Sequence, residues 1–76
     1  MQQFDITMNS FRQVREFVNL AKVQSFEVRV DDGKQEVNGK NYLGMFSIDH
    51  RLPLHVSAYG GDEECSRFQE ELAEIL

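Results

Sequence analysis

The sequence has few of the residues that would place it in a secreted, membrane-spanning or nucleic-acid-binding class. It contains one cysteine, Cys65, so no internal disulfide can form, which fits a reducing compartment. No basic flank precedes a long apolar run, so we expect neither a signal peptide nor a membrane span. Eight basic against thirteen acidic residues give a net charge of −5, which argues against nucleic acid and anionic membranes as partners. A cytoplasmic protein is the simplest interpretation.

Residues able to hold a metal ion or to build a catalytic centre are also scarce. One cysteine and two histidines, His50 and His55, do not have the spacing of a usual ligand set. There is no glycine-rich phosphate loop, and nothing in the sequence brings an acid, a base and a nucleophile together. We therefore expect no metal, no cofactor and no enzymatic activity.

The 76 residues suffice for a single domain, 1–76, with a modest core. Near the N-terminus, apolar residues alternate with polar ones at the period of a half-buried strand: Phe4, Ile6 and Met8. Helical spacing follows and predicts a helix from roughly 11 to 23, with a stripe of Phe11, Val14, Val18 and Ala21. At its start, Ser10 and Gln13 have the spacing of a capping box, in which the Ser10 hydroxyl accepts from the first turn and Gln13 reaches back.

The rest of the chain alternates between strand and helix signals. Strands are predicted at 26–30, 35–38 and 52–59, with a hairpin turn at 31–34 and a short helix at 41–47. Asp62 is expected to cap a final helix whose buried stripe is Cys65, Phe68, Leu72 and Ile75 or Leu76. This order predicts an α+β open-faced β-sandwich, with a four-stranded, mostly antiparallel sheet and three helices on one face.

The short helix is unusually rich in large apolar residues: Tyr42, Leu43, Met45, Phe46 and Ile48. Tyr42 and Phe46 are four apart, and Leu43 and Phe46 are three apart, so these three can share a surface. Met45 and Ile48 would then point into the core. A two-turn helix cannot bury five large groups unless both its sides are covered. The cluster is therefore either core packing or a surface for a protein partner.

Three segments carry a family resemblance. They are Phe-Val-Asn-Leu-Ala at 17–21, Asn-Gly-Lys-Asn-Tyr-Leu-Gly-Met-Phe-Ser-Ile at 38–48, and Val-Ser-Ala-Tyr-Gly-Gly-Asp-Glu-Glu at 56–64. Together they resemble the HPr family, the histidine-containing phosphocarriers of the bacterial sugar phosphotransferase system. The resemblance covers nearly the whole chain and implies the order βαββαβα. It also implies partners of that system, met by the start of the first helix and by the short helix, where Tyr42, Leu43 and Phe46 match apolar contact positions.

The sequence departs from the HPr pattern at both residues that carry the family's phosphoryl chemistry. Ser10 stands at the phosphorylated histidine, Arg12 at the family's arginine and Gln13 at its proline. Asn41, which has no hydroxyl, stands at the regulatory serine. The resemblance therefore implies a non-phosphorylatable regulatory or protein-binding module. The alternative is a phosphocarrier with a relocated acceptor, His50, because the turn after the short helix lies beside the phosphorylated histidine in the family.

Each candidate residue also has a plainer interpretation. Ser10 is a helix cap worth about 1 kcal/mol, and a phosphoserine would not pass its phosphate on. Arg12 either binds an anion at the helix start or is a solvated side chain near Glu16. His50 is either a neutral nucleophile near Ser10 and Arg12 or an exposed residue of a turn. His55 is expected on the exposed face of the sheet.

Overall fold

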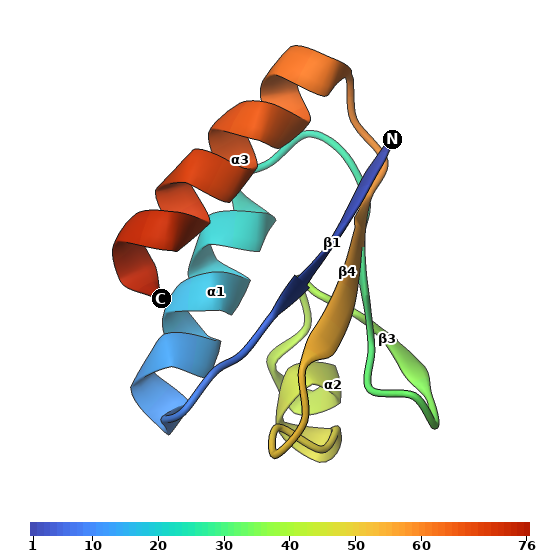
Figure 1. The fold of residues 1–76 in the computed structure, drawn as a ribbon, viewed down its shortest axis with the longest axis vertical. Helices are drawn as coiled ribbons and strands as arrows, with labels where there is room; N and C mark the ends of the chain where they lie inside the picture. Colours follow the sequence, from blue (N-terminus) through green and yellow to red (C-terminus); the bar gives the residue numbers. More distant parts are fainter.

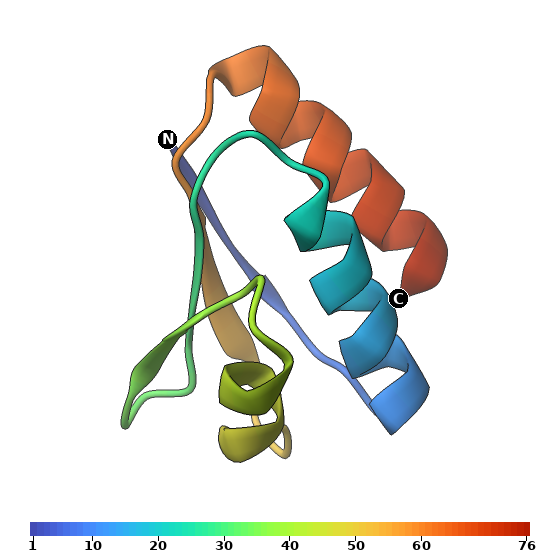
Figure 2. The ribbon, with the colours of Figure 1, turned by 180° about the vertical axis from the view of Figure 1, so that it is seen from behind.

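The computed structural model describes residues 1–76, which form four strands and three helices. Their order is β1 (Gln2–Ile6), α1 (Phe11–Lys22), β2 (Val28–Asp31), β3 (Glu36–Asn38), α2 (Tyr42–Ser47), β4 (Leu54–Ala58) and α3 (Asp62–Ile75). Both views place the three helices on the same side of the sheet, with α1 beside α3 and α2 between α1 and β3 (Figure 1 and Figure 2). The predicted open-faced β-sandwich is confirmed. No helix here combines the length and the apolar character that crossing a membrane requires.

The sheet has the strand order β1-β4-β2-β3, and every neighbouring pair is antiparallel. The last strand thus lies between the first two, which run parallel to each other on either side of it. Leu54, Val56 and Ala58 of β4 point into the core and are fully buried. His55 points to the open face of the sheet, as predicted. There its Nδ1 lies 2.9 Å from a carboxylate oxygen of Asp5 on β1.

One core of sixteen buried apolar residues joins the helices to the sheet. Phe68 of α3 lies among three other rings, with centroid distances of 6.3 Å to Phe4, 6.1 Å to Phe17 and 5.8 Å to Phe26. These tilted and edge-to-face contacts are the geometry that aromatic pairs prefer. Because the partners come from β1, α1 and the segment before β2, this ring connects α3 to α1 and to the sheet.

The structure corrects several local predictions. The strand predicted at 26–30 is β2 and begins only at Val28. Of the last two residues of the predicted buried stripe, Ile75 is half-buried and Leu76 is exposed. The cap of α3 is Gly61, and Asp62 is the first helical residue. Here the Glu64 carboxylate accepts from the Gly61 amide at 3.4 Å, so the acidic first turn supplies the cap contact. The predicted strand 52–59 begins only at Leu54, since Pro53 has no N–H to donate. Finally, Met8 follows β1 but is still buried, because the loop after β1 turns toward the core.

Candidate functional site

Ser10 caps α1, as the sequence predicts. Its Oγ accepts a hydrogen bond from the Gln13 amide at 3.2 Å, and its backbone is extended, as an N-cap requires. The second half of the predicted capping box differs, because the Gln13 side chain accepts from the Asn9 amide at 2.6 Å and not from the amide of Ser10. The Ser10 hydroxyl oxygen is therefore engaged in holding the first turn of the helix.

Arg12 lies on the surface of α1. Its Nε donates to the Glu16 carboxylate at 3.1 Å, which is an exposed pair one helical turn apart. Arg12 and Ser10 line a shallow hollow with Gln13, Glu16 and the end of α3. Ser10 also lines a second pocket with His50, and Arg12 is absent from that one. The expected grouping of Ser10, Arg12 and His50 is thus only half present in the structure.

His50 has neither ring nitrogen free for chemistry. Its Nε2 lies 2.6 Å from the carbonyl oxygen of Met45, which can only accept, so Nε2 carries the proton and donates it. The other nitrogen, Nδ1, holds the lone pair but is buried and has no hydrogen-bond partner. A nucleophile must reach its electrophile, and in this arrangement the lone pair is covered.

The pocket beside His50 has a volume of about 560 Å³ and is built from two loops. The loop from β1 to α1 and the first turn of α1 form one wall, and the turn from α2 to β4 forms the other. Its apolar lining includes Met8, Phe11 and Val14, and its polar lining includes Ser10, His50 and Arg51. Arg51 was missed in the sequence, although the order Asp49-His50-Arg51 places a cation next to the candidate histidine.

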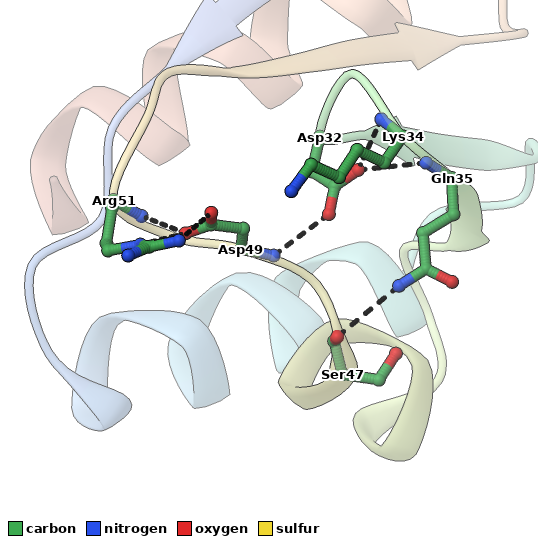
Figure 3. A network of polar contacts seen from close by, with 6 residues as sticks. All are labelled: Asp32, Lys34, Gln35, Ser47, Asp49 and Arg51. Carbon is green, nitrogen blue, oxygen red and sulfur yellow. Dashed lines mark hydrogen bonds and ion pairs between the residues drawn. The ribbon is translucent and has the colours of Figure 1, made fainter.

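A network of hydrogen bonds fixes the turn that carries His50 and Arg51 (Figure 3). One oxygen of Asp32, in the β2–β3 turn, accepts from the Asp49 amide at 2.9 Å, and the other accepts from Lys34 and Gln35. The Asp49 carboxylate in turn accepts from the backbone and guanidinium of Arg51, with Nη2 at 2.8 Å. Two turns that are far apart in sequence are therefore joined by their carboxylates.

The same hydrogen bonds shift the acidity of this network. The amide of Asp49, followed by those of Gln35 and Lys34, holds the pKa of Asp32 below its usual value. The side chain and then the backbone N–H of Arg51 hold the pKa of Asp49 well below its usual range. The Asp49 carboxylate correspondingly raises the pKa of Arg51. Both carboxylates are thus ionised, and Arg51 is charged, at neutral pH.

Helix α2 divides its apolar residues between the core and the surface. Asn41 caps it by accepting from the Gly44 amide at 3.1 Å, and Met45 and Ile48 are buried as expected. Leu43 is 83% exposed and Phe46 is 42% exposed. Of the three predicted contact residues, these two lie open to a partner.

Tyr42 is held against α1 more than the sequence suggests. Its hydroxyl hydrogen-bonds to the side chain of Asn19, and the Lys22 ammonium lies 4.3 Å from its ring centroid. A cation over an aromatic face is an attractive contact. Tyr42 therefore contributes to the joint between α1 and α2, and only part of its surface is exposed.

Phe11 takes a position that the helical pattern does not predict. It belongs to the apolar spacing of α1, yet it is 79% exposed because it is the first residue of the helix and extends beyond the core. Its ring packs against that of Phe46, with centroids 5.7 Å apart. Phe11 and Phe46 thus connect the start of α1 to α2, and Leu43 lies three residues before Phe46 on α2; we call these three exposed residues the apolar patch.

The comparisons with known proteins agree with the fold. The chain matches no protein-family model, and no curated protein sequence is significantly similar to it. Solved HPr structures do match, which defines the fold as that of the HPr phosphocarriers. HPr-C-His from Thermoanaerobacter tengcongensis has a TM-score of 0.75 and 23% identity, over 99% of this chain and 94% of that one.

Two further solved structures give the same result. The phosphocarrier protein HPr from Bacillus anthracis has a TM-score of 0.75 and 20% identity, over 99% of this chain and 95% of that one. The catabolite repression protein Crh from Bacillus subtilis, described as a swapped, intertwined dimer, has a TM-score of 0.65 and 24% identity. That match covers 99% of this chain and 90% of the Crh chain. These identities show a shared fold.

Proposed function

We propose that this chain is an HPr-like regulatory module that binds a protein partner in the bacterial cytoplasm and carries no phosphoryl group itself. The observation that carries the proposal is the apolar patch of Phe11, Leu43 and Phe46, in which the exposed rings of Phe11 and Phe46 pack against each other. A contiguous exposed apolar patch on a small domain is typical of a protein contact. The HPr-like fold supports a partner related to the sugar phosphotransferase system.

The distribution of charge supports a partner with an acidic surface. Residues 8–23 and 39–52, the two segments that contain the patch, have five basic and two acidic residues, a charge of +3. The remaining residues contain three basic and eleven acidic ones, a charge of −8. The patch therefore belongs to the basic segments of an acidic chain. Such a separation steers association toward a negatively charged surface and makes it sensitive to salt.

The docking proposal is tested by replacing Leu43 or Phe46 with aspartate and comparing the proteins retained from an extract of the host cell. We expect each substitution to remove the same bound protein, because a charge at a desolvated contact is strongly unfavourable. Tyr59→Asp is the matched control, since Tyr59 is a half-exposed aromatic residue directly after β4. The end of β4 lies at the opposite end of the sheet from α2 (Figure 1). Identical retention by the three variants and the unmodified chain would contradict the proposal.

The absence of a carrier function is tested separately by intact-mass spectrometry. The chain is incubated with phosphoenolpyruvate and a bacterial enzyme I, with an authentic HPr as the positive control. We expect no added phosphoryl mass, because Ser10 is a helix cap and the His50 lone pair is covered. A labelled chain would instead support the alternative carrier. Loss of that label in His50→Ala but not in His55→Ala would then identify His50 as the acceptor.

A further inference from the structure

We propose that the pocket between the start of α1 and the turn after α2 binds a small organic anion with an apolar body, whose acidic group contacts Arg51. The pocket volume of about 560 Å³ lies in the range of small-molecule sites. Its lining is of mixed character, as such sites require, with an apolar floor and a few polar groups. This site goes beyond the proposed docking function, although the two share Phe11.

The floor of the pocket suits an apolar body about the size of one ring. Met8 and Val14 are each 2% exposed, so they close the base of the pocket from the core, and most of the apolar surface that a ligand can reach belongs to Phe11. Phe11 forms a raised side wall, and its ring is held in place by that of Phe46. An aromatic or aliphatic group on Met8 and Val14 would gain contact with the face or edge of Phe11.

Arg51 supplies the charge that selects an anion. No aspartate or glutamate lines the pocket, although the chain as a whole has a net charge of −5. The Asp49 carboxylate binds the Nε and one N–H of Nη2, which orients the guanidinium and leaves its Nη1 edge unused. The Arg51 side chain is 85% exposed whereas that of Asp49 is 22% exposed, so the cation faces solvent and the carboxylate lies behind it. The unused edge fits a carboxylate or a phosphate.

His50 lines the same pocket but offers it no free acceptor. Its Nε2 donates to the Met45 carbonyl oxygen, and its Nδ1 is buried. Arg51 is therefore the polar group that the acidic end of a ligand can reach above the apolar floor.

The test uses the full chain alone and follows its amide signals by NMR during titration with phenyl phosphate. Inorganic phosphate and phenol are titrated separately as the two halves of the probe. We expect saturable shifts at the loop after β1, the start of α1 and residues 49–51, and weaker binding of either half. Arg51→Gln should weaken binding about tenfold, because it removes a charge-assisted hydrogen bond. Phe11→Ala should also weaken it through lost ring contact.

Two variants serve as controls and decide what each outcome means. Arg12→Gln should bind the probe normally, because Arg12 lies outside the pocket. Leu43→Asp, which disrupts the proposed docking surface, should also leave these shifts unchanged, so that failure of the two proposals can be told apart. Shifts that are absent, that do not saturate, or that depend on Arg12 and not on Arg51 would overturn the proposed site.

Discussion

Single residues at the starts of α1 and α2 perform structural tasks. Ser10 accepts from the Gln13 amide, and Asn41 does the same for α2 through the Gly44 amide. Both side chains satisfy amides that a helix leaves without partners in its first turn. Capping accounts for a short polar residue at each of these two positions.

Replacing Ser10 with alanine tests this role. We expect Ser10→Ala to lower the free energy of unfolding by about 1 kcal/mol, because it removes the side-chain acceptor of the cap. Ser10→Asp should retain most of the stability, since aspartate caps equally well and its charge is favourable at a helix N-terminus. Urea denaturation measures both variants. Equal stability of Ser10→Ala and the unmodified chain would show that the hydroxyl does not cap α1 in solution.

The residues of the pocket show where sequence reasoning reaches its limit. The cap at Ser10 was predictable, because it depends on residues only three positions apart. The presence of Arg51 in the pocket was not predictable, because the pocket forms only when two loops about forty positions apart in the sequence come together. Arg12 was expected beside Ser10 and His50, yet it pairs with its neighbour Glu16 on the helix surface. A matched position in a sequence does not fix the direction of a long, flexible side chain.

At the scale of elements, the turn that carries His50 depends on two ionised carboxylates. Asp32 and Asp49 both have lowered pKa values in the folded chain. The stability that these two ionised carboxylates give to the folded chain is therefore fully present above the ordinary aspartate pKa of about 4. It is lost as the pH falls through the lower pKa values that the two groups have in the folded chain.

We accordingly expect Asp32→Asn to lose less stability on acidification below about pH 4 than the unmodified chain does. At neutral pH the variant should be less stable, because its amide is a weaker acceptor for three backbone N–H groups. Thermal unfolding across this pH range measures both effects. Glu70→Gln is the control, since Glu70 is exposed on α3 and should leave the acid dependence nearly unchanged. Parallel acid profiles for Asp32→Asn and the unmodified chain would contradict this account.

The turn between β4 and α3 contains two glycines, and only Gly61 has room for a side chain. A Cβ at Gly60 would lie 2.5 Å from Cδ2 of Phe26, which is part of the core. We expect Gly60→Ala to destabilise the chain by about 1–3 kcal/mol through this overlap. Gly61→Ala is the matched control, because its Cβ would meet only the end of the Glu64 side chain at 3.4 Å. Urea denaturation of the pair distinguishes a local overlap from a general intolerance of the turn.

For the molecule as a whole, Phe68 joins the layer of helices to the sheet through its contacts with three other rings. Phe68→Ala would leave a cavity among Phe4, Phe17 and Phe26, and we expect a loss of about 3–5 kcal/mol. That is a large share of the stability of a small domain. Phe68→Leu should lose less, since it retains part of the volume, and it keeps the test readable if Phe68→Ala does not fold. Chemical denaturation of the two variants would reveal whether the ring holds the layers together.

The fold class followed from local periodicity, because strands and helices alternate clearly along the chain. The position of β4 between β1 and β2 could not be derived in this way, since strand pairing depends on contacts distant in sequence. The exposure of Phe11 was also not predicted, because helical spacing alone does not tell whether the first residue of an apolar stripe reaches the core. Sequence reasoning therefore succeeded for elements and failed where distant segments meet.

The position of β4 also has a consequence for how the protein is made. The ribosome delivers β1 and β2 first, but neither is the other's neighbour, since both pair with β4 on opposite sides. Until residue 58 has emerged, the nascent chain can form the β2–β3 hairpin but cannot close its sheet. Formation of the sheet is then a late step that depends on long-range contacts and slows folding. A chain halted before β4 would leave β1 unpaired and exposed to other strands in the cell.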